Sequence, residues 1–261
     1  MGRVEGSAVK ERGTRRPATL PGYTRLEVVI PIVHPPGLEK RAAEVQDLLE
    51  TGATALSEIL LVEPPELEAL LVADEDWEQA PRENEHPYPP GLPYFTRSAR
   101  RPIVVLPETL SPAFRPHTAA TGALIVWHEL AHAFLLREPV PRTPAWLREF
   151  IPQALSAAVA RRAGLPLGEH LEQVERSPAF TVRDYPSRAD AESQMAFQNL
   201  LLALGTAAVD EFGEEFLGRL AHALWSEEEV VYEDKAEELL AGSLGPEGRA
   251  WLLSRPELQE G

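Results

Sequence analysis

The sequence predicts an α+β protein in which strands come first and helices follow. Runs that are rich in β-branched residues and bounded by Pro or Gly stand in the first part of the chain, and such runs are typical of strands. From Thr118 onward the apolar residues recur at helical spacing instead. This order favours two lobes, an α/β lobe over residues 22–117 and a mostly helical lobe over residues 118–261, with the first helix of the second lobe at the junction.

The first lobe is expected to combine three strands with one long helix. The expected strands are TRLEVVIPIV from Thr24, LEALLVAD from Leu67 and RPIVVLP from Arg101. After the first of them, the segment Leu38–Leu61 has apolar residues at helical spacing, which indicates an amphipathic helix. The segment EQAPRENEHPYPPGLPYFTRS, from Glu78, is crowded with Pro and polar residues, so we expect a long loop or an irregular β-ribbon there.

The second lobe is expected to contain helices only. The predicted helices are Thr118–Arg137, Pro144–Arg162, Ser187–Leu204, Val209–Trp225 and Asp234–Leu240. In the second of these, Thr143 is the expected N-cap and Pro144 the first helical residue, where proline is favourable. In the fourth, apolar side chains from Phe212 to Leu224 share one face, which favours packing into the core.

Composition excludes several classes of function. The formal net charge of −16 disfavours electrostatic binding to nucleic acid or to an anionic membrane surface. The chain has no cysteine, so it can form neither disulfides nor a thiolate metal site. Residues 1–21 are expected to form a flexible tail, and they lack the apolar core of a secretory signal. We therefore expect a cytoplasmic protein without nucleic-acid or membrane partners; its oligomeric state has no signature in the sequence.

The candidate functional residues begin with HELAH, residues 128–132. On a helix, His128 and His132 lie on one face about 5–6 Å apart, so both imidazoles can reach one zinc ion. Glu129 is turned away from the helical face that carries the two histidines but stays near a water molecule held by the ion. This is the H-E-x-x-H arrangement of metallopeptidases, and a third ligand is needed to distinguish it from a chance match.

The third ligand is expected from the following helix. Catalytic zinc typically has three protein ligands and an open position for water. Glu149 follows on a helix that can return antiparallel and aim its carboxylate at the same ion; the alternative is a solvated carboxylate on the helix surface. Glu138 lies next to Pro139, where the preceding helix ends, and is not expected to bind. The remaining histidines lack ligand spacing and are expected to be structural or at the surface: His34, His86, His117, His170 and His222.

HELAH, followed by PAWLRE at residues 144–149, resembles the gluzincin metallopeptidases. In that family HExxH is followed by a P-x-W-L-x-E-G segment whose Glu is the third zinc ligand. The resemblance implies a zincin-like fold, with an N-terminal mixed sheet and helix lobe, a helical C-terminal lobe, and the active-site helix between them. It also implies that Zn²⁺ is bound by His128, His132 and Glu149, and that Glu129 is the general base.

Relatives in that family place a Tyr or His where it can donate to the oxyanion, and Tyr185 is the nearest candidate here, with a purely structural tyrosine as the alternative. Two positions depart from the pattern. Phe150 replaces the Gly that follows the ligand Glu, and Pro152 falls inside the expected helix, where proline removes a hydrogen bond and predicts a kink near Arg148.

These observations predict a zinc metallopeptidase whose peptide or protein substrate lies extended along an edge strand of the first lobe, with PYPPGLPYF from Pro87 as its rim. Two alternatives stay open. The short charged N-terminal region and the lack of a signal fit a cytosolic regulatory protease that cleaves a repressor. Phe150 and Pro152 motivate the other alternative, a catalytically inactive zincin-like scaffold that binds a partner.

Overall fold

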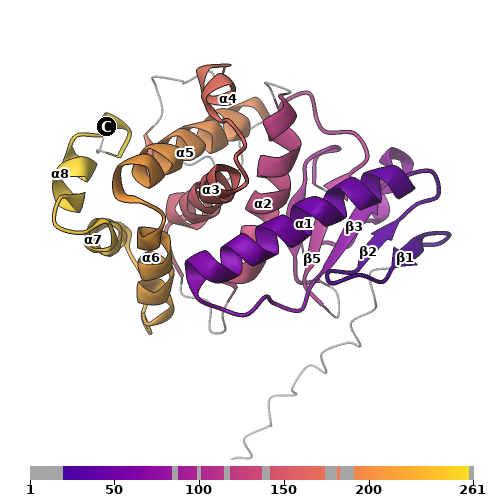
Figure 1. The fold of residues 1–261 in the computed structure, drawn as a ribbon, viewed down its shortest axis with the longest axis horizontal. Helices are drawn as coiled ribbons and strands as arrows, with labels where there is room; N and C mark the ends of the chain where they lie inside the picture. Colours follow the sequence, from indigo (N-terminus) through magenta and orange to yellow (C-terminus); the bar gives the residue numbers. More distant parts are fainter. Residues whose placement is uncertain are drawn as a thin grey trace, which may run out of the picture.

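The computed structural model describes residues 20–83, 88–98, 101–114, 118–136, 142–173, 181–182 and 191–258. Within them the strands come first and helices follow, so the α+β prediction is confirmed. Most of the predicted tail lies outside the described residues. Figure 1 shows the sheet at one end of the molecule and the last helices, α7 and α8, at the opposite end.

The sheet has five strands in the order β1-β2-β3-β5-β4. Their bounds are Thr24–Leu26 for β1, Ile32–His34 for β2, Glu68–Val72 for β3, Tyr94–Thr96 for β4 and Ile103–Pro107 for β5. The three inner strands are parallel, and β1 and β4 pair antiparallel with them at the two edges. β4 lies in the Pro-rich segment that was expected to be a long loop or an irregular β-ribbon, so part of that segment is strand.

The run from Thr24 that was predicted as one strand forms two. β1 and β2 pair antiparallel with Thr24 opposite His34, and the residues between them bend the chain back. Pro31 lies just before β2. Because proline has no N–H to donate and a fixed φ, an uninterrupted strand through this position is disfavoured.

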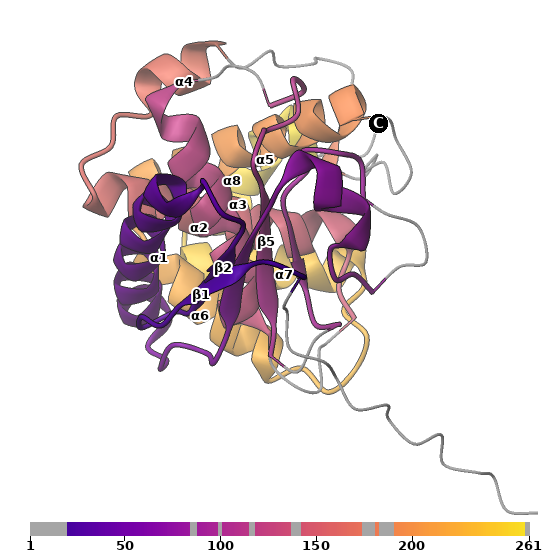
Figure 2. The same cartoon turned by 90° about the vertical axis from the view of Figure 1, so that its right-hand side faces the viewer.

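Helices cover one face of the sheet, and a smaller apolar cluster covers the other. Helices α1 (Glu39–Leu60) and α2 (Ala119–Leu135) share a core with side chains such as Leu71 and Val104. Figure 2 shows α1 running along the side of the sheet. The alternate side chains, such as Leu70 and Val105, pack with Trp77 on the opposite face. The central strands are therefore buried on both sides, as parallel strands usually are.

The remaining helices pack around α3. Their bounds are Ala145–Arg162 for α3, Gly168–Gln173 for α4, Ala191–Phe212 for α5, Glu215–Trp225 for α6, Glu233–Leu244 for α7 and Gly248–Leu253 for α8. α3 lies between α2 and α5 and is buried over most of its length. One apolar core extends from Ile30 to Leu258 and crosses the expected lobe boundary. The division into two lobes stays a prediction.

Several helix boundaries differ from prediction, most of all around Val209. Val209 does not begin a helix but lies inside α5, and the break comes at Gly213, whose φ of 73° is readily adopted only by glycine. Phe212 therefore belongs to α5 and not to the face of α6. Helix α3 begins at Ala145 with Pro144 as its N-cap, one residue later than predicted, and Thr143 is not the cap.

The expected kink near Arg148 does not end α3, because the helix continues through Pro152 to Arg162. α4 and α8 were not predicted from the sequence. No helix in the described part of the chain is long and apolar enough to cross a membrane.

Candidate metal centre

Helix α2 presents two histidines to the same point. A hydrogen bond of 2.9 Å from the Thr118 N–H to the Thr121 hydroxyl fixes the first turn of this helix. Three turns later the Nε2 atoms of His128 and His132 are 3.1 Å apart, and the two rings are nearly perpendicular. The convergence follows from their four-residue spacing on one helical face.

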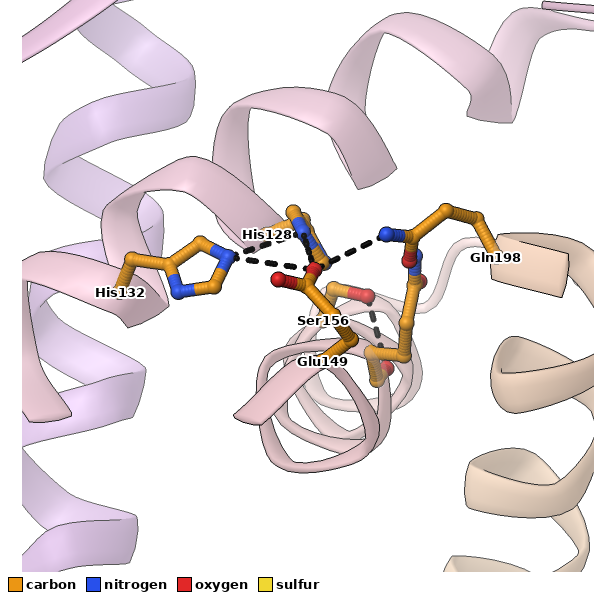
Figure 3. Close-up of polar contacts among 6 residues, drawn as sticks. His128, His132, Glu149, Ser156 and Gln198 are labelled. Atoms are coloured by element: carbon orange, nitrogen blue, oxygen red, sulfur yellow. Dashed lines mark hydrogen bonds and ion pairs between the residues drawn. The ribbon is translucent and has the colours of Figure 1, made fainter. Parts of the chain in front are cut away.

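Helix α3 brings Glu149 to the same point. Its Oε2 lies 3.4 Å from His128 Nε2 and 3.6 Å from His132 Nε2. Figure 3 shows the carboxylate facing both imidazoles. His128, His132 and Glu149 form a group that could hold a metal ion.

The dimensions of this triangle fit a small tetrahedral cation. Ligand atoms about 2.0–2.1 Å from a tetrahedral zinc ion are about 3.3–3.4 Å from one another. The three separations between His128 Nε2, His132 Nε2 and Glu149 Oε2 are 3.1, 3.4 and 3.6 Å. The group therefore needs adjustments of only a few tenths of an ångström to accept such an ion.

The two departures from the family pattern leave Glu149 in place. Phe150 is fully buried and meets Trp146 edge to face, with ring centroids 6.3 Å apart. Phe150 thus points into the core while Glu149, one residue earlier, faces the histidines. Pro152 is also buried within the continuous helix.

Glu129 lies in the same cavity but outside the triangle. Its side chain is buried, and burial raises the pKa of its carboxyl above the ordinary value, although the neighbouring histidines and a hydrogen bond from the Phe95 backbone oppose the shift. Phe95 belongs to the edge strand β4. Glu129 therefore lies in the cavity that holds the three-residue group and is tied to the edge strand by the Phe95 backbone.

The charges of the group favour a cation at its centre. Burial disfavours the charged form of Glu149, but His132 and His128 outweigh it and hold the pKa of this carboxyl well below its usual range. Burial likewise disfavours a protonated His132, yet Glu149 and Glu129 raise the pKa of its imidazole above the ordinary value. A proton on His132 thus occupies the electrostatic role that a metal ion would take.

Two glutamine side chains extend the group, and the sequence analysis did not single them out. Gln198 on α5 donates from Nε2 to Glu149 Oε2 at 2.9 Å, and Gln153 on α3 donates to Gln198 Oε1 at 2.7 Å. The available signal was a glutamine recurring after four positions, Gln194 and Gln198, with the apolar residues Met195 to Phe197 between them.

The group opens into a cavity of about 470 Å³. This volume lies in the ordinary range for sites that bind small molecules or side chains. One face of α2, from Thr121 to His132, forms one wall, and β4 with the loop before it, α3 and α5 form the others. Several apolar side chains line it, among them Leu124, Ile125 and Met195.

The other histidines have different roles. His34 Nδ1 and His222 Nε2 each lie 2.9 Å from a backbone carbonyl, which fits the structural role that was expected. His170 was not expected near the site, but it lines the cavity and its Nδ1 lies 2.8 Å from the Thr118 hydroxyl. Burial lowers the pKa of His170.

Four residues of the sequence analysis lie outside the described residues: Tyr185, Glu138, His86 and His117. The role of Tyr185 as an oxyanion donor stays a prediction. No protein-family model matches the chain, and a search of curated proteins found no match.

Proposed function

We propose that this protein is a zinc-dependent metallopeptidase with a zincin-like, two-lobed fold. The observation that carries the proposal is the convergence of His128, His132 and Glu149 on one point, with Glu129 buried beside them in the same cavity. Two imidazole nitrogens and one carboxylate oxygen are a donor set of catalytic zinc sites, and they leave the fourth tetrahedral position for water.

The bound ion would lower the pKa of a water molecule towards about 7 and polarise the scissile carbonyl. Glu129 would accept a proton from that water and pass it to the leaving amine. Burial suits Glu129 to this role because it raises the pKa of the carboxyl, which makes the carboxylate a stronger base.

The substrate is proposed to be a peptide held along β4. This strand forms the edge of the sheet beside β5, and its residues Tyr94 and Phe95 line the cavity. An extended peptide can add to such an edge through main-chain hydrogen bonds. Tyr185 is retained as the proposed oxyanion donor, and the cytoplasm as the proposed location.

The proposal is tested by zinc content and by cleavage of unfolded casein and a peptide library. We expect one zinc ion per chain, cleavage that a chelator abolishes, and recovery of cleavage when zinc is added back. A protein that binds zinc fully but cleaves nothing in the library would support the inactive scaffold instead. The proximity of Glu149 to both imidazoles favours the enzyme, since Phe150 and Pro152 were the grounds for the scaffold.

Cleavage of a single transcription factor, with no cleavage of casein or library peptides, would favour the regulatory protease. No contact in the described part of the chain distinguishes that protease from a broad peptidase, so the regulatory protease remains an alternative.

A further inference from the structure

We propose that Gln153 and Gln198 form an amide relay that holds Glu149 as a ligand through one carboxylate oxygen. The inference rests on the proposed metal site and adds two positioning residues to it. Figure 3 shows Gln198 reaching from α5 towards the carboxylate that faces the histidines. The hydrogen bonds run from Gln153 Nε2 to Gln198 Oε1 at 2.7 Å and from Gln198 Nε2 to Glu149 Oε2 at 2.9 Å.

The direction of the relay follows from the chemistry of its last member. A glutamate that binds a metal ion does so as a carboxylate, and an ionised carboxylate can only accept hydrogen bonds. Gln198 must therefore turn its NH₂ group towards Glu149 and its oxygen away. Gln153 must then turn its own NH₂ group towards that oxygen. The carboxylate thus fixes the orientation of both amides.

The relay also controls how the carboxylate faces the ion. Gln198 donates to Oε2, the oxygen that lies within 3.6 Å of both imidazole nitrogens. A donor on that oxygen holds the carboxylate plane in one orientation, which favours ligation by one oxygen and leaves a position free for water. Because the amide is neutral, it orients Glu149 without cancelling the charge that attracts the metal ion.

The competing explanation is that the amides only join α3 to α5. Both glutamines lie between these helices, which pack closely together. A structural link predicts a change in the stability of the protein but no specific change in metal coordination. The relay predicts that coordination changes even where the fold is retained. Partners of this kind typically contribute about 10–100-fold to metal affinity.

The test uses three leucine variants of the full chain, each prepared free of metal. Gln198→Leu removes the donor to Glu149. Gln153→Leu leaves Gln198 in place but removes the group that orients it, so it probes the relay without touching a ligand. Gln194→Leu is the matched control, because Gln194 is on the same helix and lines the same cavity, while the amide that donates to Glu149 is that of Gln198.

Zinc affinity is measured by competition with a chromophoric chelator, and coordination by the visible absorption of bound Co²⁺. We expect Gln198→Leu to weaken zinc binding by about 10–100-fold. Gln153→Leu should weaken it less, and Gln194→Leu should leave it within about twofold of wild type. The Co²⁺ absorption of Gln198→Leu should lose intensity, because a carboxylate that binds through both oxygens raises the coordination number, and higher coordination absorbs more weakly.

Equal zinc affinity and equal Co²⁺ spectra for wild type and Gln198→Leu would overturn the relay while leaving the peptidase proposal intact. An equal loss in Gln194→Leu would also overturn it, since general loosening of α5 would then explain the effect. If Gln198→Leu does not fold, Gln153→Leu decides in the same way. Failure of wild-type protein to bind zinc would overturn both the relay and the proposed function.

Discussion

At the residue scale, Glu149 is the one carboxylate among the described residues that groups with both imidazoles as a possible metal ligand. Replacing it with Ala removes one of three ligands and leaves two neutral donors. Loss of a residue that only orients a ligand is expected to weaken zinc binding by about 10–100-fold, and Glu149→Ala should weaken it by more than that. Chelator competition measures the change. Unchanged affinity would show that another carboxylate binds the ion, and the search would move to Asp184, Asp190 and Glu192.

Arg148 is the one Lys or Arg among the described residues that line the cavity, and its side chain is exposed. A guanidinium there attracts a carboxylate on the substrate. Peptides with an acidic residue beside the scissile bond should be cleaved faster than peptides carrying the matching amide. Arg148→Ala should reduce that preference by about fivefold at most, because exposed ion pairs contribute no more than about 1 kcal/mol. The ratio of kcat/KM for the two peptides is the measurement, and an unchanged ratio would rule out this role.

Residue spacing was enough to place some of these groups but not others. His128 and His132 are brought together by the geometry of a single helix, so their spacing predicted their convergence. Glu149 needed one further assumption, that the next helix returns beside the first. Gln198 approaches from a third helix. The packing of α5 on α3 decides which way its side chain points, and no local sequence pattern predicts that packing.

At the scale of elements, the close approach of α5 to α3 depends on Gly205. A Cβ at this position would lie 2.8 Å from the Cα of Ala154, and backbone cannot move aside as a flexible side chain can. Gly205→Ala should therefore destabilise the protein by about 1–3 kcal/mol, as overpacking usually does. Urea unfolding measures the difference.

Gly242 in α7 provides the control for this substitution. No atom lies within 4 Å of the Cβ that Gly242→Ala would add. The same change should be neutral or stabilise the protein by up to about 1 kcal/mol, because Ala has the higher helix propensity. Equal effects at Gly205 and Gly242 would contradict the close contact between α3 and α5.

The elements that were misplaced share a physical cause. Gly205 lies inside α5, where the absence of a side chain lets α3 pack closely. Gly213 ends α5, because the chain adopts a positive φ there. Sequence alone gives both residues the same weight. Pro152 likewise costs about 3 kcal/mol in an isolated helix, yet packing on both sides keeps α3 continuous. Tertiary contacts decide these cases.

At the scale of the whole molecule, the site couples metal binding and stability to pH. In metal-free protein the pKa of Glu149 is depressed, so its contribution to stability is present above about pH 4.3 and is lost as pH falls through the folded-state pKa. The pKa of His132 is raised, so its contribution is full below about pH 6.5 and is lost as pH rises through its folded-state pKa. Together they stabilise the metal-free protein most between those two values.

A bound zinc ion would reverse the upper part of this profile. Binding requires a neutral His132, so protons compete with the ion below the raised pKa of that imidazole. Zinc affinity, and the rise in Tm that zinc causes, should therefore be larger at pH 8 than at pH 6. Thermal unfolding with and without zinc at the two pH values measures this difference. If the zinc-induced rise in Tm is the same at both pH values, the ion does not displace a proton from His132.

The most direct measurement compares Glu129→Gln with wild type for zinc content and for cleavage of a substrate that wild-type protein cleaves. The substitution keeps the size of the side chain but removes its basic oxygen. Zinc content should stay at the wild-type level, because Glu129 lies outside the ligand triangle. Cleavage should fall by about 10²–10⁴-fold, as for a lost general base. Equal cleavage rates at full zinc content would contradict the account, since the buried carboxyl would then have no part in the chemistry.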